Sequence, residues 1–340
     1  MKNSILLLLV FLLVSCVPVS KAPAAAITQT LNANPATKQN TSSINNVTNN
    51  ANLGLIGRVL VYTPNAIYIA NSDGSVPVLI HTIESPFFMM SLSPDGTRFA
   101  YFQDNYLYIQ NVKTGDAKPL NQEIIGSMGG ELRWSRDGKK IALSCSTANE
   151  PASSGSICLI DADSGQIEIL IREKDLGEVH PFYSIYFIEL EDWSRDGSKI
   201  VFTYYTPSKK GQKQDFEIYL YDMSSKTTRK ILDGKKQDVI TQIGSAAISP
   251  DNKTLLISGV DASSSFQIFR VDLESNSLSQ LTKSATYSFS VPVWGSDNSY
   301  FYVHVEQNTS PLKEGTAILN ANGDILSFLD IKGAVIGWIK

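Results

Sequence analysis

From residue 53 onward, short segments of alternating apolar and polar residues are separated by tight turns, in an order that repeats five times. Each repeat opens with an apolar segment that ends in Trp, Leu or Ile and runs into a turn that begins Ser-x-Asp or Ser-Asp. These turns lie at residues 93–96, 135–138, 194–197, 249–252 and 296–298. Ser, Pro, Asp and Gly in this order favour a type I turn. Successive aspartates are 42, 59, 55 and 46 residues apart, a spacing in or just above the range of β-propeller blades.

Three further strands are expected after each turn. Second strands are predicted at 98–102, 140–144, 199–204, 254–258 and 300–305. Third strands, with alternating β-branched and aromatic residues, are predicted at 106–112, 157–161, 217–221, 267–271 and 316–319. A second repeated turn and a short fourth strand follow. Four antiparallel strands per repeat form the blade of a β-propeller.

The two ends of this region complete each other. Residues 58–80 contain only the last three strands of a blade, whereas residues 333–340 form a single apolar strand that carries Trp338. The sequence therefore predicts an all-β fold over residues 53–340. This fold is a six-bladed β-propeller of four-stranded antiparallel blades, closed by the C-terminal strand, which completes the first blade. Such closure removes exposed sheet edges.

The pattern Trp-Ser-x-Asp-Gly-x-x-Ile-Ala, clearest from Trp134 to Ala142, resembles the repeats of TolB-like propellers and of the propeller domains of prolyl-oligopeptidase-type enzymes. The resemblance covers essentially all of residues 53–340. It implies the fold and says little about function. TolB itself has an additional α/β domain and is not lipidated, and the peptidases add a hydrolase domain; this sequence is expected to have room for neither.

Residues 1–15 have the charge pattern and short apolar run of an export signal. The apolar run has ten residues, whereas a membrane-spanning helix needs about 20. The motif Leu-Val-Ser-Cys that ends at Cys16 resembles the lipobox of bacterial lipoproteins. The resemblance implies cleavage before Cys16, attachment of acyl chains such as palmitate, and a membrane anchor. The alternative is a plain secretory signal with an incidental cysteine.

Residues 16–52 are rich in Ala, Thr, Ser, Asn and Gln, a composition that cannot bury enough apolar surface to fold. We expect a disordered tether that spans about 30 to 35 Å. The protein is therefore expected in the cell envelope, on the periplasmic or extracellular face. Val17 follows the cysteine, where an Asp does not stand. In a cell with two membranes, this resembles the sequence of lipoproteins that are sent to the outer membrane.

Composition narrows the possible partners. Of the 340 residues, 43% are hydrophobic and 18% are charged, which excludes disorder as the main state. Residues 1–52 hold three lysines and no acidic residue, so the rest has 26 basic and 33 acidic residues, a net charge of −7. Nucleic-acid binding, which needs a basic face, is not expected.

A search for catalytic or metal-binding motifs predicts no catalytic residue, cofactor or metal site. The sequence has no Gly-x-Ser-x-Gly elbow, and its three histidines, among them His304, stand apart from metal-binding motifs. The segment 161–165 faintly resembles a calcium loop, but Arg172 occupies the twelfth position, so a turn is the better interpretation. Glu189 and Glu191 share one strand, with no second carboxylate pair evident.

Cys145 and Cys158 fall on the second and third strands of one blade. Symmetric placement about the hairpin puts them opposite each other, where a disulfide can form. In an oxidising envelope we expect that disulfide; the alternative is two buried thiols.

The variable loops, at 173–186, 206–215 and 307–315, are expected on one face of the propeller, opposite the repeated turns. Function usually lies on such loops, and aromatic residues beside cations are typical interface anchors. The predicted partner-binding residues are His180, Phe182, Tyr183, Tyr186, Tyr204, Lys209 and Lys210. The alternative is that the aromatics pack into the mouth of the propeller.

Three functional interpretations follow. The first is a monomeric, membrane-anchored propeller that binds an envelope protein or peptide without catalysis. The second is an envelope enzyme or carbohydrate-binding protein that acts on glycans at the channel mouth, because propeller enzymes draw their residues from different blades. The third is a purely structural or assembly component.

Overall fold

The computed structural model describes residues 53–82, 89–103, 106–120, 130–145, 155–176, 188–206, 215–307, 313–329, 331 and 333–339. Internal contacts divide the chain into Met1–Asn45 and Asn46–Lys340, and every described residue belongs to the second unit. The predicted signal, the lipidated Cys16 and the tether therefore lie outside the described residues.

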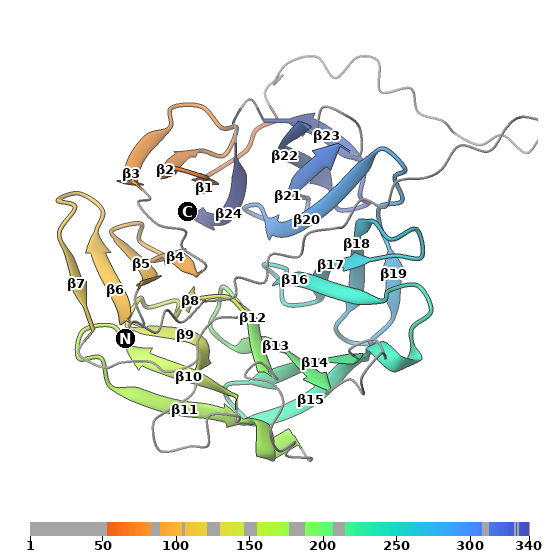
Figure 1. Ribbon diagram of the computed structural model, residues 1–340, viewed down its shortest axis with the longest axis horizontal. Helices are drawn as coiled ribbons and strands as arrows, with labels where there is room; N and C mark the ends of the chain where they lie inside the picture. The colour runs from red at the N-terminus through yellow and green to blue at the C-terminus, as the bar shows by residue number, and fades with distance from the viewer. Residues whose placement is uncertain are drawn as a thin grey trace, which may run out of the picture. The chain divides into compact units, whose positions relative to one another are not determined.

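Six four-stranded antiparallel sheets surround a central axis as blades (Figure 1). From the axis outward, the strands are β24 (Ala334–Ile339), β1 (Arg58–Thr63), β2 (Ala66–Asn71) and β3 (Val78–Thr82) in blade 1; β4 (Met90–Leu92), β5 (Arg98–Gln103), β6 (Tyr106–Asn111) and β7 (Ala117–Pro119) in blade 2; β8 (Arg133–Trp134), β9 (Lys140–Cys145), β10 (Ser156–Asp161) and β11 (Ile167–Arg172) in blade 3; β12 (Ile188–Trp193), β13 (Lys199–Thr206), β14 (Asp215–Asp222) and β15 (Thr227–Asp233) in blade 4; β16 (Gln242–Ile248), β17 (Thr254–Val260), β18 (Phe266–Asp272) and β19 (Leu278–Gln280) in blade 5; and β20 (Tyr287–Trp294), β21 (Tyr300–Gln307), β22 (Lys313–Asn320) and β23 (Ile325–Phe328) in blade 6. The predicted all-β, six-bladed fold is confirmed.

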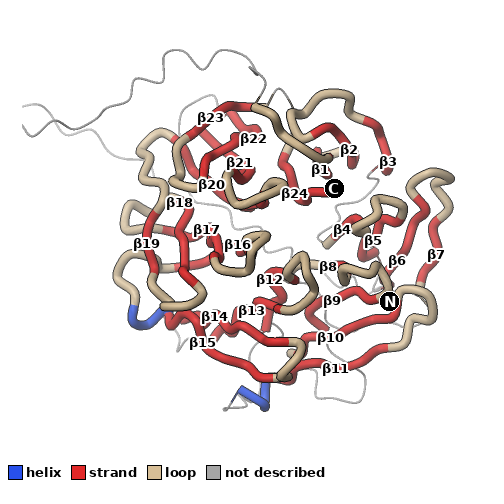
Figure 2. Tube along the Cα trace, turned by 180° about the vertical axis from the view of Figure 1, so that it is seen from behind, coloured by secondary structure: helices blue, strands red, loops and turns tan. Residues whose placement is uncertain are grey.

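Two short 3₁₀ helices, η1 (Glu173–Leu176) and η2 (Gly234–Lys236), lie at the outer rim (Figure 2). Within the described part of the chain, no helical segment has the length and apolar character that crossing a bilayer demands.

The C-terminal strand closes the ring, as predicted. β24 pairs antiparallel with β1, so that Arg58 lies opposite Ile339 and Val59 opposite Trp338. The indole N–H of Trp338 donates to the Ile56 carbonyl at 2.9 Å, which ties the last strand to the segment before β1. Blade 1 is therefore assembled from both ends of the propeller.

The repeated turns are held by their own side chains. The Ser93 hydroxyl donates to the Asp95 carboxylate at 2.6 Å and accepts the backbone N–H of Arg98 at 2.9 Å. The same two bonds recur at Ser135, Ser194 and Ser249. Burial opposes ionisation of Asp196, but hydrogen bonds from Ser198 and Ser194 lower its pKa to about 2. These aspartates therefore have a structural role, as predicted.

The core fills the wedges between neighbouring blades. Successive residues of a strand face opposite sides, so Val303 packs against blade 5 whereas Tyr302 packs against blade 1. The largest fully buried side chains are Tyr302, Phe99, Phe202, Phe269 and Phe301. Each wedge thus joins two blades through large apolar side chains, and closure of the ring completes the last one.

Cys145 and Cys158 form a disulfide between β9 and β10, with their Cα atoms 5.9 Å apart. The prediction that they lie directly opposite each other is wrong. Cys145 lies opposite Ser156 and Cys158 opposite Leu143, because the strand register is shifted by two residues relative to symmetric placement. The bond therefore joins a diagonal pair, and it joins the two strands beside the 146–155 connection.

Candidate functional site

The ends of the six inner strands surround a funnel of about 430 Å³. Every inner strand, β24, β4, β8, β12, β16 and β20, contributes residues to its wall. The volume lies within the usual range of ligand pockets. The funnel opens among the repeated turns, at the opposite ends of the blades from Thr206 and Gln307, where β13 and β21 end.

Four tryptophans form much of the funnel wall, and each is fixed by its indole N–H. Trp134 donates to the Ser91 carbonyl of the preceding blade at 3.1 Å, and Trp294 donates to the Ala247 carbonyl in the same way at 3.1 Å. Trp193 donates to Gly197 within its own turn at 3.2 Å. A large flat side chain with one polar atom fits the narrow end of a wedge and also satisfies a backbone carbonyl there. A hydrogen bond to a backbone carbonyl therefore holds each of these indoles in place.

Arg133 in β8 is held in place by two carboxylates. Its guanidinium donates to Glu131 at 2.9 Å and to Asp192 at 3.0 Å. Burial alone would lower the pKa of Arg133, but these two carboxylates raise it above its ordinary value. Asp192 also accepts the backbone N–H of Ile248 at 2.8 Å. This network links the inner strands of blades 3, 4 and 5 and leaves Arg133 neutralised.

Arg195 crosses the funnel. It follows β12 in blade 4, yet its guanidinium donates to the Trp294 carbonyl of blade 6 at 2.6 Å. The same guanidinium lies 4.3 Å from the ring centroid of Trp338 in blade 1, a cation–π contact. Burial lowers the pKa of Arg195. No carboxylate of the described residues forms an ion pair with it.

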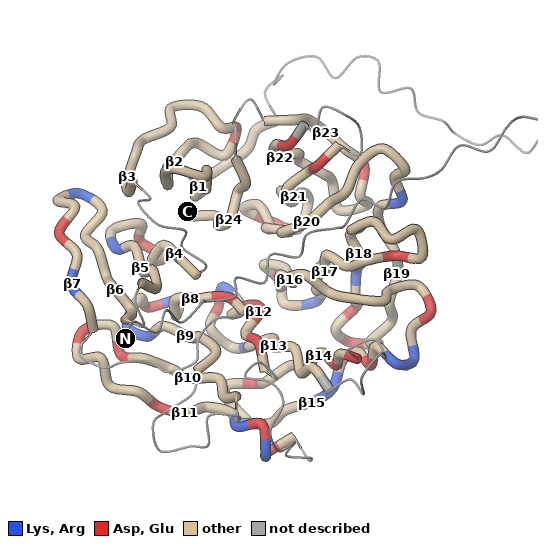
Figure 3. The backbone as a smooth tube through the Cα atoms, viewed as in Figure 1, with Lys and Arg blue, Asp and Glu red and all other residues tan. Residues whose placement is uncertain are grey.

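Arg136 completes the cationic part of the funnel. It occupies the second position of the blade 3 turn, is exposed, and lies beside Gly197 of the next turn. Within the described ranges it has neither a hydrogen bond nor an ion pair. Figure 3 shows charges of both signs where β8 and β12 approach the centre. Arg133, Arg136 and Arg195 stand against Asp192 and Glu131, so the funnel has an excess of one positive charge in a body of net charge −7.

Buried carboxylates lie earlier along β12. Glu191 is 2% exposed and accepts the Thr203 hydroxyl at 2.6 Å and the Ala246 N–H at 3.1 Å. Burial raises its pKa to about 8 and raises the pKa of Glu189 as well. The negative charge of Glu131 also raises the pKa of Glu189 and of Glu191. The sequence identified the pair on β12 but not this third carboxylate, because only the fold brings Glu131 close.

Of the predicted partner-binding residues, the structure describes only Tyr204. Tyr204 is 6% exposed and packs in the wedge between blades 3 and 4. Its assignment to an exposed contact patch is wrong, because this position of the second strand faces the neighbouring blade. The other predicted residues lie outside the described ranges: His180, Phe182, Tyr183, Tyr186, Lys209 and Lys210. The funnel arginines had a sequence signal, since Arg replaces Pro at the second position of two repeated turns.

Comparisons with known proteins agree on the fold. A family model described as the TolB beta propeller domain matches residues 58–286. TolB from Acinetobacter baumannii is 18% identical, with a TM-score of 0.61 over 85% of this chain and 69% of that chain. A putative TolB from Agrobacterium tumefaciens is 17% identical, with a TM-score of 0.57 over 81% of this chain and 91% of that chain.

Enzymes share the architecture as well. A prolyl endopeptidase structure is 12% identical, with a TM-score of 0.51 over 82% of this chain and 42% of that chain. No curated protein matches the sequence significantly. Likenesses at this level of identity concern the fold alone. The family model covers about two thirds of the sequence and includes four of its five repeated turns, so the chain belongs to the TolB β-propeller family.

Proposed function

We propose that this protein is a membrane-anchored lipoprotein of the cell envelope whose propeller binds a protein or extended peptide, without catalysis, through an acidic group held in the funnel. One observation carries this proposal. Arg136 and Arg195 line a funnel walled by tryptophans, and neither forms an ion pair with a carboxylate of the described residues. Guanidinium groups bind carboxylates in a bidentate, charge-assisted manner.

Family membership supports a scaffold that binds protein partners. The shape of the funnel supports an extended segment, because flat indole walls and two cationic side chains suit a narrow chain that ends in, or carries, a carboxylate. Glu191 is buried and hydrogen-bonded within the protein. It therefore offers no acid group to a ligand in the funnel.

Charge reversal in the funnel should weaken partner binding. A photoreactive residue at Pro94, which lines the funnel, should cross-link one specific protein in living cells. Arg136→Glu should reduce this product at least tenfold, about 1.4 kcal/mol, because it removes an attractive charge and adds a repulsive one. Mass spectrometry and quantitative immunoblotting measure the product.

Lys139→Glu is the matched control, since Lys139 is exposed directly after the same turn but does not line the funnel. It should leave the cross-linked product unchanged. Cross-linked glycan instead of protein would favour the carbohydrate-binding alternative. Equal loss with both variants would contradict a role for the funnel.

The membrane anchor is supported by the Leu-Val-Ser-Cys motif that ends at Cys16. Cys16→Ala should move the protein from the membrane fraction to the soluble fraction and abolish labelling by radioactive palmitate, because the acylated thiol is lost. Cys145→Ala is the control, since that thiol is in the disulfide. Unchanged fractionation and labelling of the Cys16 variant would rule out the anchor.

A further inference from the structure

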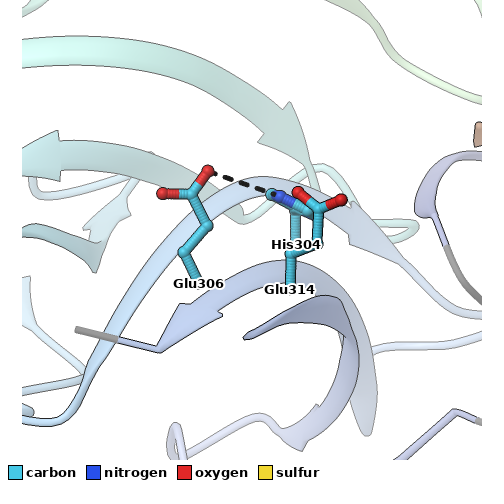
Figure 4. A group of neighbouring side chains, drawn as sticks. All are labelled: His304, Glu306 and Glu314. Carbon is cyan, nitrogen blue, oxygen red and sulfur yellow. Dashed lines mark ion pairs between the residues drawn. The ribbon is translucent and has the colours of Figure 1, made fainter. Parts of the chain in front are cut away.

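Three side chains of blade 6 come together away from the funnel. His304 and Glu306 are two residues apart on β21, and Glu314 of β22 lies directly opposite Glu306. The three therefore share one face of the sheet. One nitrogen or oxygen from each lies within 4.8 Å of the other two (Figure 4). The face is the one on which Tyr302 packs against blade 1.

Neither nitrogen of the His304 imidazole forms a hydrogen bond with a described residue. Its side chain is 16% exposed. Nδ1 is buried without a hydrogen-bond partner, and Nε2 lies 3.7 Å from the Glu306 carboxylate, beyond hydrogen-bond range. Buried polar atoms nearly always have a partner. Nε2, the nitrogen that faces the Glu306 carboxylate, therefore has no hydrogen bond to a described residue and is the atom available to a cation.

The two glutamates have little charge compensation, because the contact of Glu306 with His304, dashed in Figure 4, is an ion pair only when the imidazole is protonated. Like charges directly opposite on neighbouring strands destabilise a sheet. Within the described ranges, neither Glu306 nor Glu314 forms an ion pair with a lysine or arginine. A cation between them would turn this repulsion into attraction.

We infer that His304, Glu306 and Glu314 bind a divalent transition-metal ion, with Zn²⁺ as the preferred occupant. Two donors that each lie about 2.1 Å from one ion at a tetrahedral angle are about 3.4 Å apart. The three donor atoms lie within 4.8 Å of one another, with 3.7 Å between Nε2 and the Glu306 oxygen, so shifts of about 1.4 Å or less bring them to that spacing. An imidazole ligand disfavours Ca²⁺ and Mg²⁺. Three protein ligands leave a position for water. The site goes beyond the proposed function, because β21 and β22 do not line the funnel.

The position of the site connects it to ring closure. Thr316, opposite His304 on β22, donates its hydroxyl to the Gly333 carbonyl at 2.8 Å and accepts the N–H of Val335 at 3.2 Å. These bonds hold the start of β24. An ion that joins β21 to β22 would fix the hairpin on which the closing strand rests, so metal binding should raise the thermal stability of the propeller.

Titration calorimetry and thermal melting of the purified full chain test the site. The chain should bind one equivalent of Zn²⁺ with micromolar affinity, and its Tm should rise in Zn²⁺ relative to EDTA. Glu314→Gln and His304→Gln should each weaken binding at least tenfold and remove the rise. Glu274→Gln, at an exposed position in a blade 5 turn, is the matched control and should behave as wild type.

Co²⁺ provides a second readout that depends on the ligands. The wild-type complex should show a visible absorption band that His304→Gln loses or shifts. Melting in EDTA shows that each variant is folded. The inference is overturned if Zn²⁺ binds more weakly than about 100 μM, if Glu314→Gln and Glu274→Gln bind equally well, or if Ca²⁺ binds as tightly as Zn²⁺ and His304→Gln has no effect.

Discussion

Deletion of residues 333–340 should leave a propeller that no longer unfolds in one cooperative transition. The deletion removes β24, which pairs along β1 and carries the buried side chains of Val335 and Ile339. Each such side chain contributes about 1.5 to 3 kcal/mol by burial, and the hydrogen bond from Trp338 to Ile56 is lost as well. The sum is comparable with the 5 to about 15 kcal/mol by which whole domains are stable.

Circular dichroism melts of the full and truncated chains measure this effect. Loss of β24 also exposes the edge of β1, which invites pairing with other chains, so the truncated form should aggregate. Addition of a peptide of residues 333–340 should restore part of the transition by strand addition, whereas a scrambled peptide should not. A truncated chain that melts as sharply and as late as the intact one would refute closure by β24.

Glu191→Gln should stabilise the protein at pH 8 and have little effect near pH 5. Burial raises the pKa of Glu191 to about 8, whereas the unfolded chain loses this proton above about pH 4.5. The folded state therefore holds one more proton than the unfolded state between these values. Stability from the neutral carboxyl is complete at low pH and is lost as pH rises, at about 1.4 kcal/mol per unit and about 5 kcal/mol in all.

Glutamine reproduces the neutral acid, since its oxygen can accept from Ala246 and its amide can donate to the Thr203 hydroxyl. Urea unfolding at pH 5, 6.5 and 8 measures the difference between variant and wild type, which isolates this group from other titrations. Glu274→Gln, an exposed control, should give a constant difference. A constant difference for Glu191→Gln as well would show that Glu191 is ionised in the folded protein.

The blades could be predicted because their signal is local. Alternation of apolar residues, the Ser-x-Asp-Gly turns and the incomplete blade at one end each depend on residues close in sequence. Features that depend on register or on the distance between blades could not be read in this way. The diagonal disulfide, the burial of Tyr204 and the pairing of Glu306 with Glu314 all follow from strand register, in which one step reverses the face of every side chain.

The funnel could not be predicted from the sequence for a related reason, because it depends on contacts between blades. Arg195 and Trp294 are 99 residues apart, and Glu131 acts on Glu189 and Glu191 only because β8 and β12 are neighbours around the axis. A sequence pattern shows that Arg stands where other repeats have Pro. It does not show that this side chain reaches past an entire blade.

The reach of Arg195 has a consequence for selectivity. Its guanidinium already has a carbonyl acceptor and an aromatic face, so an incoming molecule must offer more than these to draw it away. A negatively charged group does so, because charge-assisted hydrogen bonds are about twice as strong as neutral ones. With an uncharged molecule of the same shape, Arg195 would lose both contacts without forming a stronger one. Arg195 would therefore stay in place across the funnel and exclude that molecule.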